Sequence, residues 1–253
     1  MKLLRIVAHM ITGLWVLRRL AVRREPRLTK RRVQLWHRKA LHLFGLERVL
    51  VGEIPAGPCL IVSNHLSWID ILMIGSIMNV RFLSKAEVAS WPLVGRLATG
   101  AGTLYVHRGD RRSAEQALDD IAQALAAGDQ VVVFPEGTST RGPMPIKFRS
   151  RLIEAARRVG VPVVPMALSY HGPGKEFASY AGDDEFVSHM SRLSRAPFIR
   201  GRVAVGRPIA CDEPAAAIAR QAQADVESLL ESVVCQPRGT LTQSGDLALV
   251  TTH

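Results

Sequence analysis

The sequence predicts an α/β fold: a single domain with a mixed, largely parallel sheet flanked by helices, preceded by two N-terminal helices. From Leu60 onward, short β-branched runs alternate with helical patterns, which is typical of a largely parallel sheet. The 253 residues are 47% hydrophobic and 22% charged, which suits one sizeable core and excludes wholesale disorder. The basic residues gather at one end of the chain.

The N-terminal segment carries the whole net charge. Residues 1–48 contain 13 Lys or Arg and 2 Asp or Glu, whereas the remaining 205 residues contain 20 of each. The formal net charge of +11 therefore belongs to the N-terminal end, and the rest is a neutral globule. A nucleic-acid-binding surface spread over the whole fold does not fit this distribution, and we expect no nucleic-acid partner.

Two helices are expected in this segment, Leu3–Val22 and Thr29–Phe44, with Pro26 breaking the chain between them. The uninterrupted apolar stretch of the first run is only about half of the roughly 20 residues that a spanning helix needs. Apolar residues with Trp beside Lys and Arg describe a helix that lies in the lipid interface. Residues 1–48 are thus predicted to be a basic amphipathic two-helix motif that associates with an anionic membrane surface, on the cytoplasmic face of the inner (cell) membrane. The alternatives are a solvated basic face on a docking helix pair and a nucleic-acid arm.

Domain limits and redox compartment follow from composition. Residues 49–235 are expected to form the α/β domain, and residues 236–253, which lack any period, a flexible tail. The three cysteines, Cys59, Cys211 and Cys235, form neither a zinc pattern nor a disulfide framework, which favours a reducing compartment.

Six short runs, most of them containing β-branched residues, predict the strands of the sheet: Cys59–Ser63, Arg81–Ser84, Thr103–His107, Gln130–Phe134, Val163–Leu168 and Arg202–Val205. Three helices are expected between or after them: Ser113–Ala127, Ser150–Val159 and Glu213–Val234. Ser113 and Gln116 have the spacing of a capping box, and Gly128 follows as a stop signal. Pro214 suits the first turn of the last helix.

Polar residues follow the predicted strands. Asn64 and His65 follow the first, Lys85 the second, Arg108 the third and Glu136 the fourth. Because ligands of open α/β sheets bind outside the carboxyl ends of strands, these side chains are expected to converge at one edge. This convergence predicts an enzyme.

His65 and Asp70 have the spacing of a base and the carboxylate that orients it. If a helix begins near Ser67, Asp70 folds back to accept one imidazole N–H and leaves the other nitrogen free to take a proton. Such a pair forms the base half of a catalytic triad. The simpler alternative is a helix-capping Asp beside a surface His.

The run Phe134-Pro-Glu-Gly-Thr-Ser-Thr140 predicts a tight turn after a strand. Gly137 permits close backbone approach, and the turn amides with the hydroxyls of Thr138 and its neighbours make a small anion cradle. An ordinary strand-to-loop turn is the alternative. Arg108 is a planar cation that suits phosphate or carboxylate, or else a solvated edge residue. Lys85 either neutralises an anionic substrate or pairs with Glu87.

Together these residues resemble the glycerolipid acyltransferase family, whose best-known members are 1-acyl-glycerol-3-phosphate acyltransferases. Order and spacing agree over roughly residues 58–170. The matching blocks are Asn64–Asp70 with its His-x4-Asp signature, Gly102–Arg108, Phe134–Thr138 and Val161–Pro165.

The resemblance implies transfer of a fatty acyl group from an acyl thioester, on CoA or acyl carrier protein, to a lyso-lipid hydroxyl. The first expectation for the acceptor is 1-acyl-sn-glycerol-3-phosphate, giving phosphatidic acid. His65 would be the general base and Asp70 its orienting group, with Lys85, Arg108, Glu136, Gly137 and Thr138 binding substrate. No metal or other cofactor is implied, because the thioester is already activated.

Two departures from the family pattern concern the acceptor. Ser139 stands where many lysophosphatidate acyltransferases have Arg, and His107 stands where an acidic residue often precedes Arg108. The alternative acceptor is therefore a non-phosphate lyso-lipid such as lyso-ornithine lipid. Two other classes remain open: a serine hydrolase using Ser63 or Ser67, although no Gly-x-Ser-x-Gly elbow is present, and a lipid-binding protein without catalysis.

Overall fold

The computed structural model describes residues 2–23, 26–107, 109–142, 144–182 and 184–234. Its centre is a seven-stranded sheet with the strand order β1-β7-β6-β2-β5-β3-β4. Neighbouring strands run parallel, except that β6 and β7 are antiparallel. The expected mixed, largely parallel sheet is confirmed. The strands are β1 (Leu46–Val51), β2 (Leu60–Ser63), β3 (Arg81–Lys85), β4 (Leu104–Val106), β5 (Val131–Val133), β6 (Val163–His171) and β7 (Ile199–Val205).

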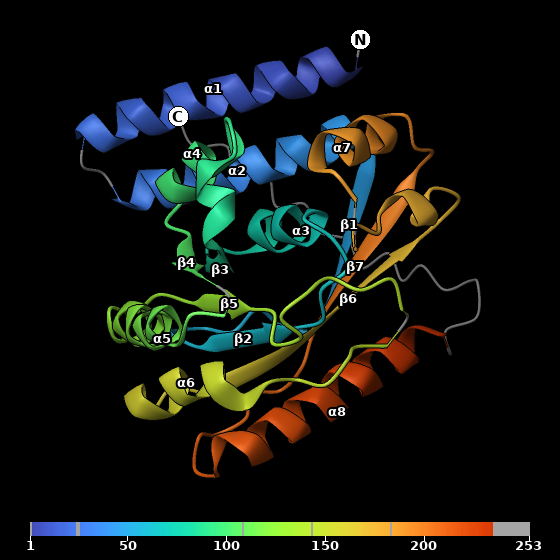
Figure 1. Cartoon of the computed structure of the whole chain (residues 1–253). Coiled ribbons are helices and arrows are strands. Elements are labelled where there is room, and N and C mark those ends of the chain that lie inside the picture. The colour runs from blue at the N-terminus through green and yellow to red at the C-terminus, as the bar shows by residue number, and fades with distance from the viewer. Residues whose placement is uncertain (1, 24–25, 108, 143, 183, 235–253) are drawn as a thin grey trace, which may run out of the picture.

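Helices cover both faces of this sheet, as Figure 1 shows. One side carries α1 (Lys2–Arg23), α2 (Pro26–Phe44), α3 (Ile69–Ile77), α4 (Val94–Gly100) and α7 (Phe186–Ser194). The other carries α5 (Arg111–Ala126), α6 (Ile153–Val159) and α8 (Ala215–Val234). Short 3₁₀ turns are η1 (Ala86–Ser90), η2 (Ser150–Leu152) and η3 (Lys175–Phe177).

The alternation of side chains along β2 explains why both faces are covered. Ile61 packs into the hydrophobic cluster shared with α2, α3 and α7, while Leu60 and Val62 pack into the cluster shared with α5, α6 and α8. Successive residues of a strand point to opposite faces, so a strand that is apolar throughout needs a layer on each side. The central strand is therefore buried and rigid at the point where the site begins.

The edge strand β1 was missed by the sequence analysis. Its charged residues Glu47 and Arg48 hide the strand pattern, and within it only Leu46 is buried. Pairing with β7 along Leu46–Val51 forms the strand. The expected domain boundary after residue 48 falls inside β1, so the N-terminal segment runs directly into the sheet.

The start predicted for α5 was wrong. The helix begins at Arg111 and is capped by Asp110, whose carboxylate accepts the Arg112 N–H at 2.9 Å. Ser113 is not a cap, because its hydroxyl accepts the His107 N–H at 2.8 Å. The Asp110 carboxylate thus satisfies a helix amide that would otherwise be unpaired, and it does so three residues before the predicted cap at Ser113.

The remaining sequence expectations differ from the structure in smaller ways. Helix α8 begins at Ala215 rather than Glu213, with Pro214 directly before it. Helices α4 and α7 and the end of β6 beyond Leu168 were not predicted. The expected tail, residues 236–253, and Cys235 lie outside the described residues.

The two N-terminal helices pack on the domain through polar contacts as well as apolar ones. His9 Nε2 lies 3.0 Å from the Trp36 carbonyl oxygen, and Trp36 Nε1 donates to the His9 carbonyl at 3.1 Å. The two rings stack with centroids 4.9 Å apart. Gly13 faces the Trp36 indole, where a Cβ would collide. These contacts fix the register of α1 against α2.

Helix α2 is fixed in turn to α3. Gln34 Nε2 donates to the Ile77 carbonyl at 2.6 Å, and Arg38 Nε donates to the Ser76 carbonyl at 2.9 Å. The buried His37 ring lies against Gly75, where any Cβ would overlap it. Since α3 begins beside the candidate site, the N-terminal helices are connected to that site through a continuous packed layer.

The outer face of α1 is apolar and exposed. Leu4, Ile11 and Trp15 are 74%, 53% and 55% exposed. The Arg19 guanidinium lies 3.6 Å from the centroid of the Trp15 ring. Within the described residues, no helix combines the length and apolarity that crossing a membrane requires.

Burial of His37 predicts a loss of stability in acid. Burial lowers the pKa of His37 from 6.5 to about 4, whereas the unfolded chain takes up this proton near the ordinary value. The unfolded state therefore binds more protons than the folded state as the pH falls below 6.5. The free energy of unfolding decreases by about 2 kcal/mol between pH 7 and pH 5. Urea unfolding at both pH values should show a smaller loss in His37→Gln than in wild type. Burial also lowers the pKa of His9 and His189, but these residues are present in both proteins and contribute equally. An equal loss of unfolding free energy in wild type and His37→Gln would therefore contradict the assignment to His37.

Candidate active site

Asp70 occupies the first turn of α3 and binds the loop that precedes it. Its Oδ2 atom accepts the N–H groups of Leu66 at 2.7 Å and Ser67 at 2.9 Å. The same oxygen lies 2.8 Å from His65 Nδ1, and the carboxylate is fully buried. The predicted contact between Asp70 and the imidazole is confirmed. Because Nδ1 donates to Asp70, the lone pair of the neutral ring lies on Nε2.

Tyr170 on β6 completes the surroundings of Asp70. Its hydroxyl donates to Asp70 Oδ1 at 2.6 Å. Burial and the adjacent Asp70 charge raise the pKa of Tyr170 well above its ordinary value, so the phenol keeps its proton. Tyr170 was not among the predicted site residues, because the expected strand ended at Leu168, whereas β6 continues to His171. The available sequence signal was its position two residues beyond the expected strand Val163–Leu168.

The His65 ring lies at the surface of this cluster. Its side chain is 21% exposed and stacks on Phe134 with ring centroids 4.0 Å apart. In the described part of the chain, Nε2 has no protein hydrogen-bond partner. A ring held by Asp70 and Phe134 with Nε2 open can accept a proton from a bound hydroxyl.

Glu136 supports His65 from the neighbouring strand end. Its Oε1 accepts the His65 N–H at 2.7 Å, and its Oε2 accepts the Ile146 N–H at 3.0 Å. The side chain is buried, and this burial raises the pKa of the Glu136 carboxyl. These contacts make Glu136 a bridge between the His65 backbone and the loop after β5. The expected contact of Glu136 with an acceptor stays a prediction.

Asn64 holds the site to the sheet. Asn64 Nδ2 donates to the Leu168 carbonyl of β6 at 2.9 Å, and the Leu168 N–H donates to Asn64 Oδ1 at 2.8 Å. A side chain thus extends the pairing of β2 with β6 beyond Ser63. This keeps the chain extended as it leaves the sheet and fixes where His65 emerges.

The turn after β5 matches the expected shape. Gly137 has a φ of +74°, and its N–H donates to the Phe134 carbonyl at 3.0 Å. The Thr140 N–H donates to the His65 carbonyl at 2.8 Å, which holds the turn beside the histidine. Among the described contacts, the N–H groups of Thr138 and Ser139 have no protein acceptor. These two amides, rather than that of Gly137, are available to an anion.

The other predicted site residues have different positions. Thr138 is exposed, and its hydroxyl donates to the Ser139 carbonyl at 3.4 Å. Lys85 is exposed at the carboxyl end of β3, two strands from β2 in the sheet order. Arg108 lies outside the described residues. The topology confirms that Lys85 shares the sheet edge with His65 and Glu136.

A cation missed by the sequence analysis lies beside the turn. The Arg149 guanidinium carbon is 3.4 Å from the position that a Cβ on Gly137 would occupy. The Arg149 N–H donates to the Pro135 carbonyl at 3.0 Å, which holds this exposed residue next to the turn. Its distance of twelve residues from Gly137 along the chain left no local signal. Within the described ranges, no group of three or more His, Cys, Asp or Glu is arranged to hold a metal ion.

Comparison with known proteins places this geometry in a family. The model of the Acyltransferase family matches residues 46–169, which include His65, Asp70 and Glu136. A lyso-ornithine lipid O-acyltransferase of Pseudomonas aeruginosa is 39% identical over 208 residues, covering 80% of each chain. The chain belongs to the acyltransferase family.

Other relatives of this acyltransferase fall under two different enzyme names. A lyso-ornithine lipid O-acyltransferase of Brucella abortus is 35% identical over 224 residues, covering 81% of this chain and 84% of its relative. A 1-acyl-sn-glycerol-3-phosphate acyltransferase of Neisseria gonorrhoeae is 34% identical over 132 residues, covering 51% of each. The resemblance drawn from the His-x4-Asp block is thus confirmed at the level of the family.

The fold of the acyltransferase also matches a solved structure. The crystal structure of the 1-acyl-sn-glycerophosphate acyltransferase PlsC from Thermotoga maritima aligns with a TM-score of 0.68 at 17% identity. The alignment covers 94% of this chain and 100% of that chain, so the shared architecture includes the N-terminal helices.

Removing the base or its orienting group should stop acyl transfer without unfolding the protein. We expect His65→Ala to lower kcat by about 10²- to 10⁴-fold, the usual contribution of general-base assistance. Asp70→Asn should be similarly severe, because a neutral amide can keep the contacts with His65, Leu66 and Ser67 but lacks the negative charge that stabilises the imidazolium formed in the reaction. Single-turnover acyl transfer and thermal unfolding of both variants measure the two effects. Near-wild-type turnover in His65→Ala would overturn the assignment.

Proposed function

We propose that this acyltransferase moves a fatty acyl group from an acyl thioester, on CoA or acyl carrier protein, to the free hydroxyl of a lyso-lipid. The observation that carries the chemistry is the 2.8 Å contact of His65 Nδ1 with Asp70 Oδ2, which leaves Nε2 open. Nε2 takes the proton of the attacking hydroxyl as its oxygen bonds to the thioester carbon. The C–S bond then breaks, and the imidazolium returns the proton to the leaving thiolate.

The charge that develops on the thioester oxygen needs donors near His65. We assign this role to the N–H groups of Thr138 and Ser139, because the turn that carries them is bonded to the His65 carbonyl. Backbone donors fixed before the reaction stabilise such an oxyanion without reorganisation in the transition state. Gly137 contributes the positive φ that shapes the turn.

The acceptor we favour is lyso-ornithine lipid. Its support is the greater identity and coverage of the Pseudomonas and Brucella relatives compared with the Neisseria enzyme. Ser139, in place of the arginine common in lysophosphatidate acyltransferases, agrees with an acceptor that lacks a phosphate monoester. Arg149 beside Gly137 is a suitable partner for a carboxylate on the acceptor.

A second candidate acceptor is 1-acyl-sn-glycerol-3-phosphate, which was the first expectation from the sequence. The Neisseria relatives carry that activity in their names, and Arg149 suits a phosphate as well as a carboxylate.

A serine hydrolase receives no support from the geometry. Ser63 and Ser67 are both fully buried, and the Ser63 hydroxyl donates to the Asn64 carbonyl at 3.1 Å. Neither hydroxyl is placed to attack a substrate.

We further propose that the protein attaches to the cytoplasmic surface of the membrane through α1. The exposed apolar residues Leu4, Ile11 and Trp15 would enter the lipid interface. Arg5, Arg18 and Arg19, also exposed on α1, would contact anionic head groups. Both the acyl thioester donors and the more anionic leaflet are on that side.

An acceptor comparison tests the proposed reaction. Full-length protein in detergent is assayed with lyso-ornithine lipid and with 1-acyl-sn-glycerol-3-phosphate, using acyl-CoA and acyl carrier protein donors of one chain length. We expect kcat/KM for lyso-ornithine lipid to be at least about tenfold higher, which corresponds to 1.4 kcal/mol of transition-state binding. His65→Ala is the control. A preference for the glycerol phosphate would support the second candidate instead, and no transfer to either would contradict the proposed function.

Vesicle flotation tests the attachment through α1. We expect wild type to float with vesicles containing anionic lipid and to be released only partly by high salt, because apolar insertion is not screened. A variant with Leu4, Ile11 and Trp15 replaced by Ser should lose flotation, whereas Val187→Ser, an exposed apolar residue on α7, should not. Unchanged flotation of the triple variant, or complete release of wild type by salt, would contradict apolar insertion.

A further inference from the structure

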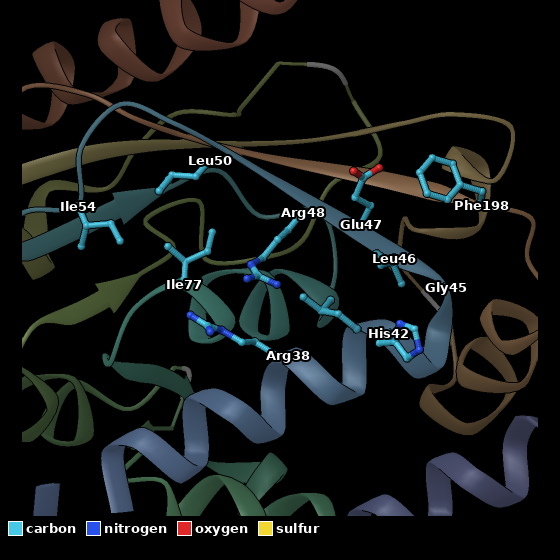
Figure 2. A pocket seen from close by; sticks show the side chains of 11 residues that line it. Arg38, His42, Gly45, Leu46, Glu47, Arg48, Leu50, Ile54, Ile77 and Phe198 are labelled. Atoms are coloured by element: carbon cyan, nitrogen blue, oxygen red, sulfur yellow. The ribbon is translucent and has the colours of Figure 1, made fainter. Parts of the chain in front are cut away.

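A large pocket lies away from His65, between the C-terminal part of α2, the edge strand β1 and the end of α3 (Figure 2). Its volume is about 780 Å³. The residues that line it come from α2, β1, the segment after β1, the end of α3 and Phe198 before β7, and none of the candidate catalytic residues is among them. The reaction described above therefore leaves this pocket without a role.

Two arginines share one wall of this pocket. Figure 2 shows the side chains of Arg38 and Arg48 reaching toward each other beside Ile77. Burial and the charge of Arg38 lower the pKa of Arg48. Among the described ion pairs, neither arginine has an acidic partner. Two like charges held together without a counter-charge favour binding of an anion.

The one acidic residue of the pocket does not neutralise them. Glu47 points outward from the neighbouring position of β1, and its Oε2 accepts from Arg200 Nε at 3.1 Å. Arg38 is kept in place by its donation to the Ser76 carbonyl, so the pair is partly preorganised.

Most of the other residues that line the pocket are apolar. Leu50, Ile54 and Phe198 line it and are 39%, 42% and 47% exposed. An inorganic anion would leave these side chains in water. A ligand with an anionic head and an apolar chain would instead remove apolar surface, such as that of Leu50 and Ile54, from water.

The pocket also continues a surface of α2. Arg31, Leu35, Arg38 and His42 follow one another at helical spacing, and all four are exposed. This basic and apolar stripe begins near the start of α2 and ends in the pocket. A lipid that contacts this stripe would meet basic and apolar side chains along α2 as far as the pocket.

We propose that this pocket is a binding site for an anionic phospholipid, distinct from the site of acyl transfer. The phosphate lies between the guanidinium groups of Arg38 and Arg48, and an acyl chain lies along Leu50 and Ile54, which share one end of the pocket. Planar guanidinium groups form paired hydrogen bonds with phosphate oxygens, which favours an anionic head group over a zwitterionic one.

Calorimetric titration of the full-length protein in detergent tests this site. The probes are dioctanoyl phosphatidylglycerol, dioctanoyl phosphatidylcholine and inorganic phosphate. We expect the phosphatidylglycerol to bind at least about tenfold more tightly than either of the others. Arg48→Gln should weaken that binding about tenfold or more, within the range for a charge-assisted hydrogen bond. Ile54→Ser should weaken phosphatidylglycerol binding and leave phosphate binding unchanged.

The matched control is Arg220→Gln, an exposed arginine on α8 at the opposite side of the sheet. It should bind phosphatidylglycerol like wild type, and thermal unfolding of each variant confirms that it is folded. Unchanged binding in Arg48→Gln would overturn the proposal, because the lipid would then occupy another site, such as the site of acyl transfer. Equal affinity for inorganic phosphate would show an anion site only, and equal affinity for phosphatidylcholine an apolar groove only. Either result would also overturn it.

Discussion

The structure of the site depends on one buried carboxylate. Asp70 accepts hydrogen bonds from the amides of Leu66 and Ser67, from the Tyr170 hydroxyl and from the His65 ring. A buried charge is tolerated only when it is fully hydrogen-bonded, so the Asp70 carboxylate requires these donors. It also holds them in position. The chain between β2 and α3 has little freedom left once this carboxylate is in place. The orientation of His65 follows from that constraint.

A second set of contacts extends this constraint across the sheet edge. Glu136 accepts the His65 amide, and Asn64 pairs with Leu168, so the turn after β5 and the middle of β6 both hold the segment that carries the base. The Thr140 amide holds the turn after β5 to the His65 carbonyl. The base and the proposed oxyanion donors therefore move together.

Much of this arrangement follows from patterns that are local in sequence. His65 and Asp70 are close along the chain, and the positive φ of Gly137 is typical of a turn glycine, so both could be predicted. Six strands were recognisable as short apolar runs bounded by polar or turn residues, and five of them contain β-branched residues. Their convergence at one edge follows from parallel topology alone.

The features that were missed depend on contacts distant in sequence or on competition between local signals. Tyr170 reaches Asp70 from a strand one hundred residues later. Strand β1 exists because β7 pairs with it, despite its charged residues. At α5 Ser113 and Gln116 have the spacing of a capping box, but Asp110, an equally favoured N-cap residue, caps the helix three residues earlier. Secondary structure propensity could not decide between them.

The mutual hydrogen bonds between His9 and Trp36 have a consequence for the geometry of the whole molecule. A slide of α1 along α2 by a single residue would break both bonds, and α2 leads through Gly45 directly into β1 of the sheet. The packing of α1 on α2, and of α2 on α3, therefore fixes the position of the apolar face of α1 relative to His65. If that face rests on lipid, the histidine can reach hydroxyl groups at only one depth, so acceptors are selected by where their hydroxyl lies as well as by the head group they carry.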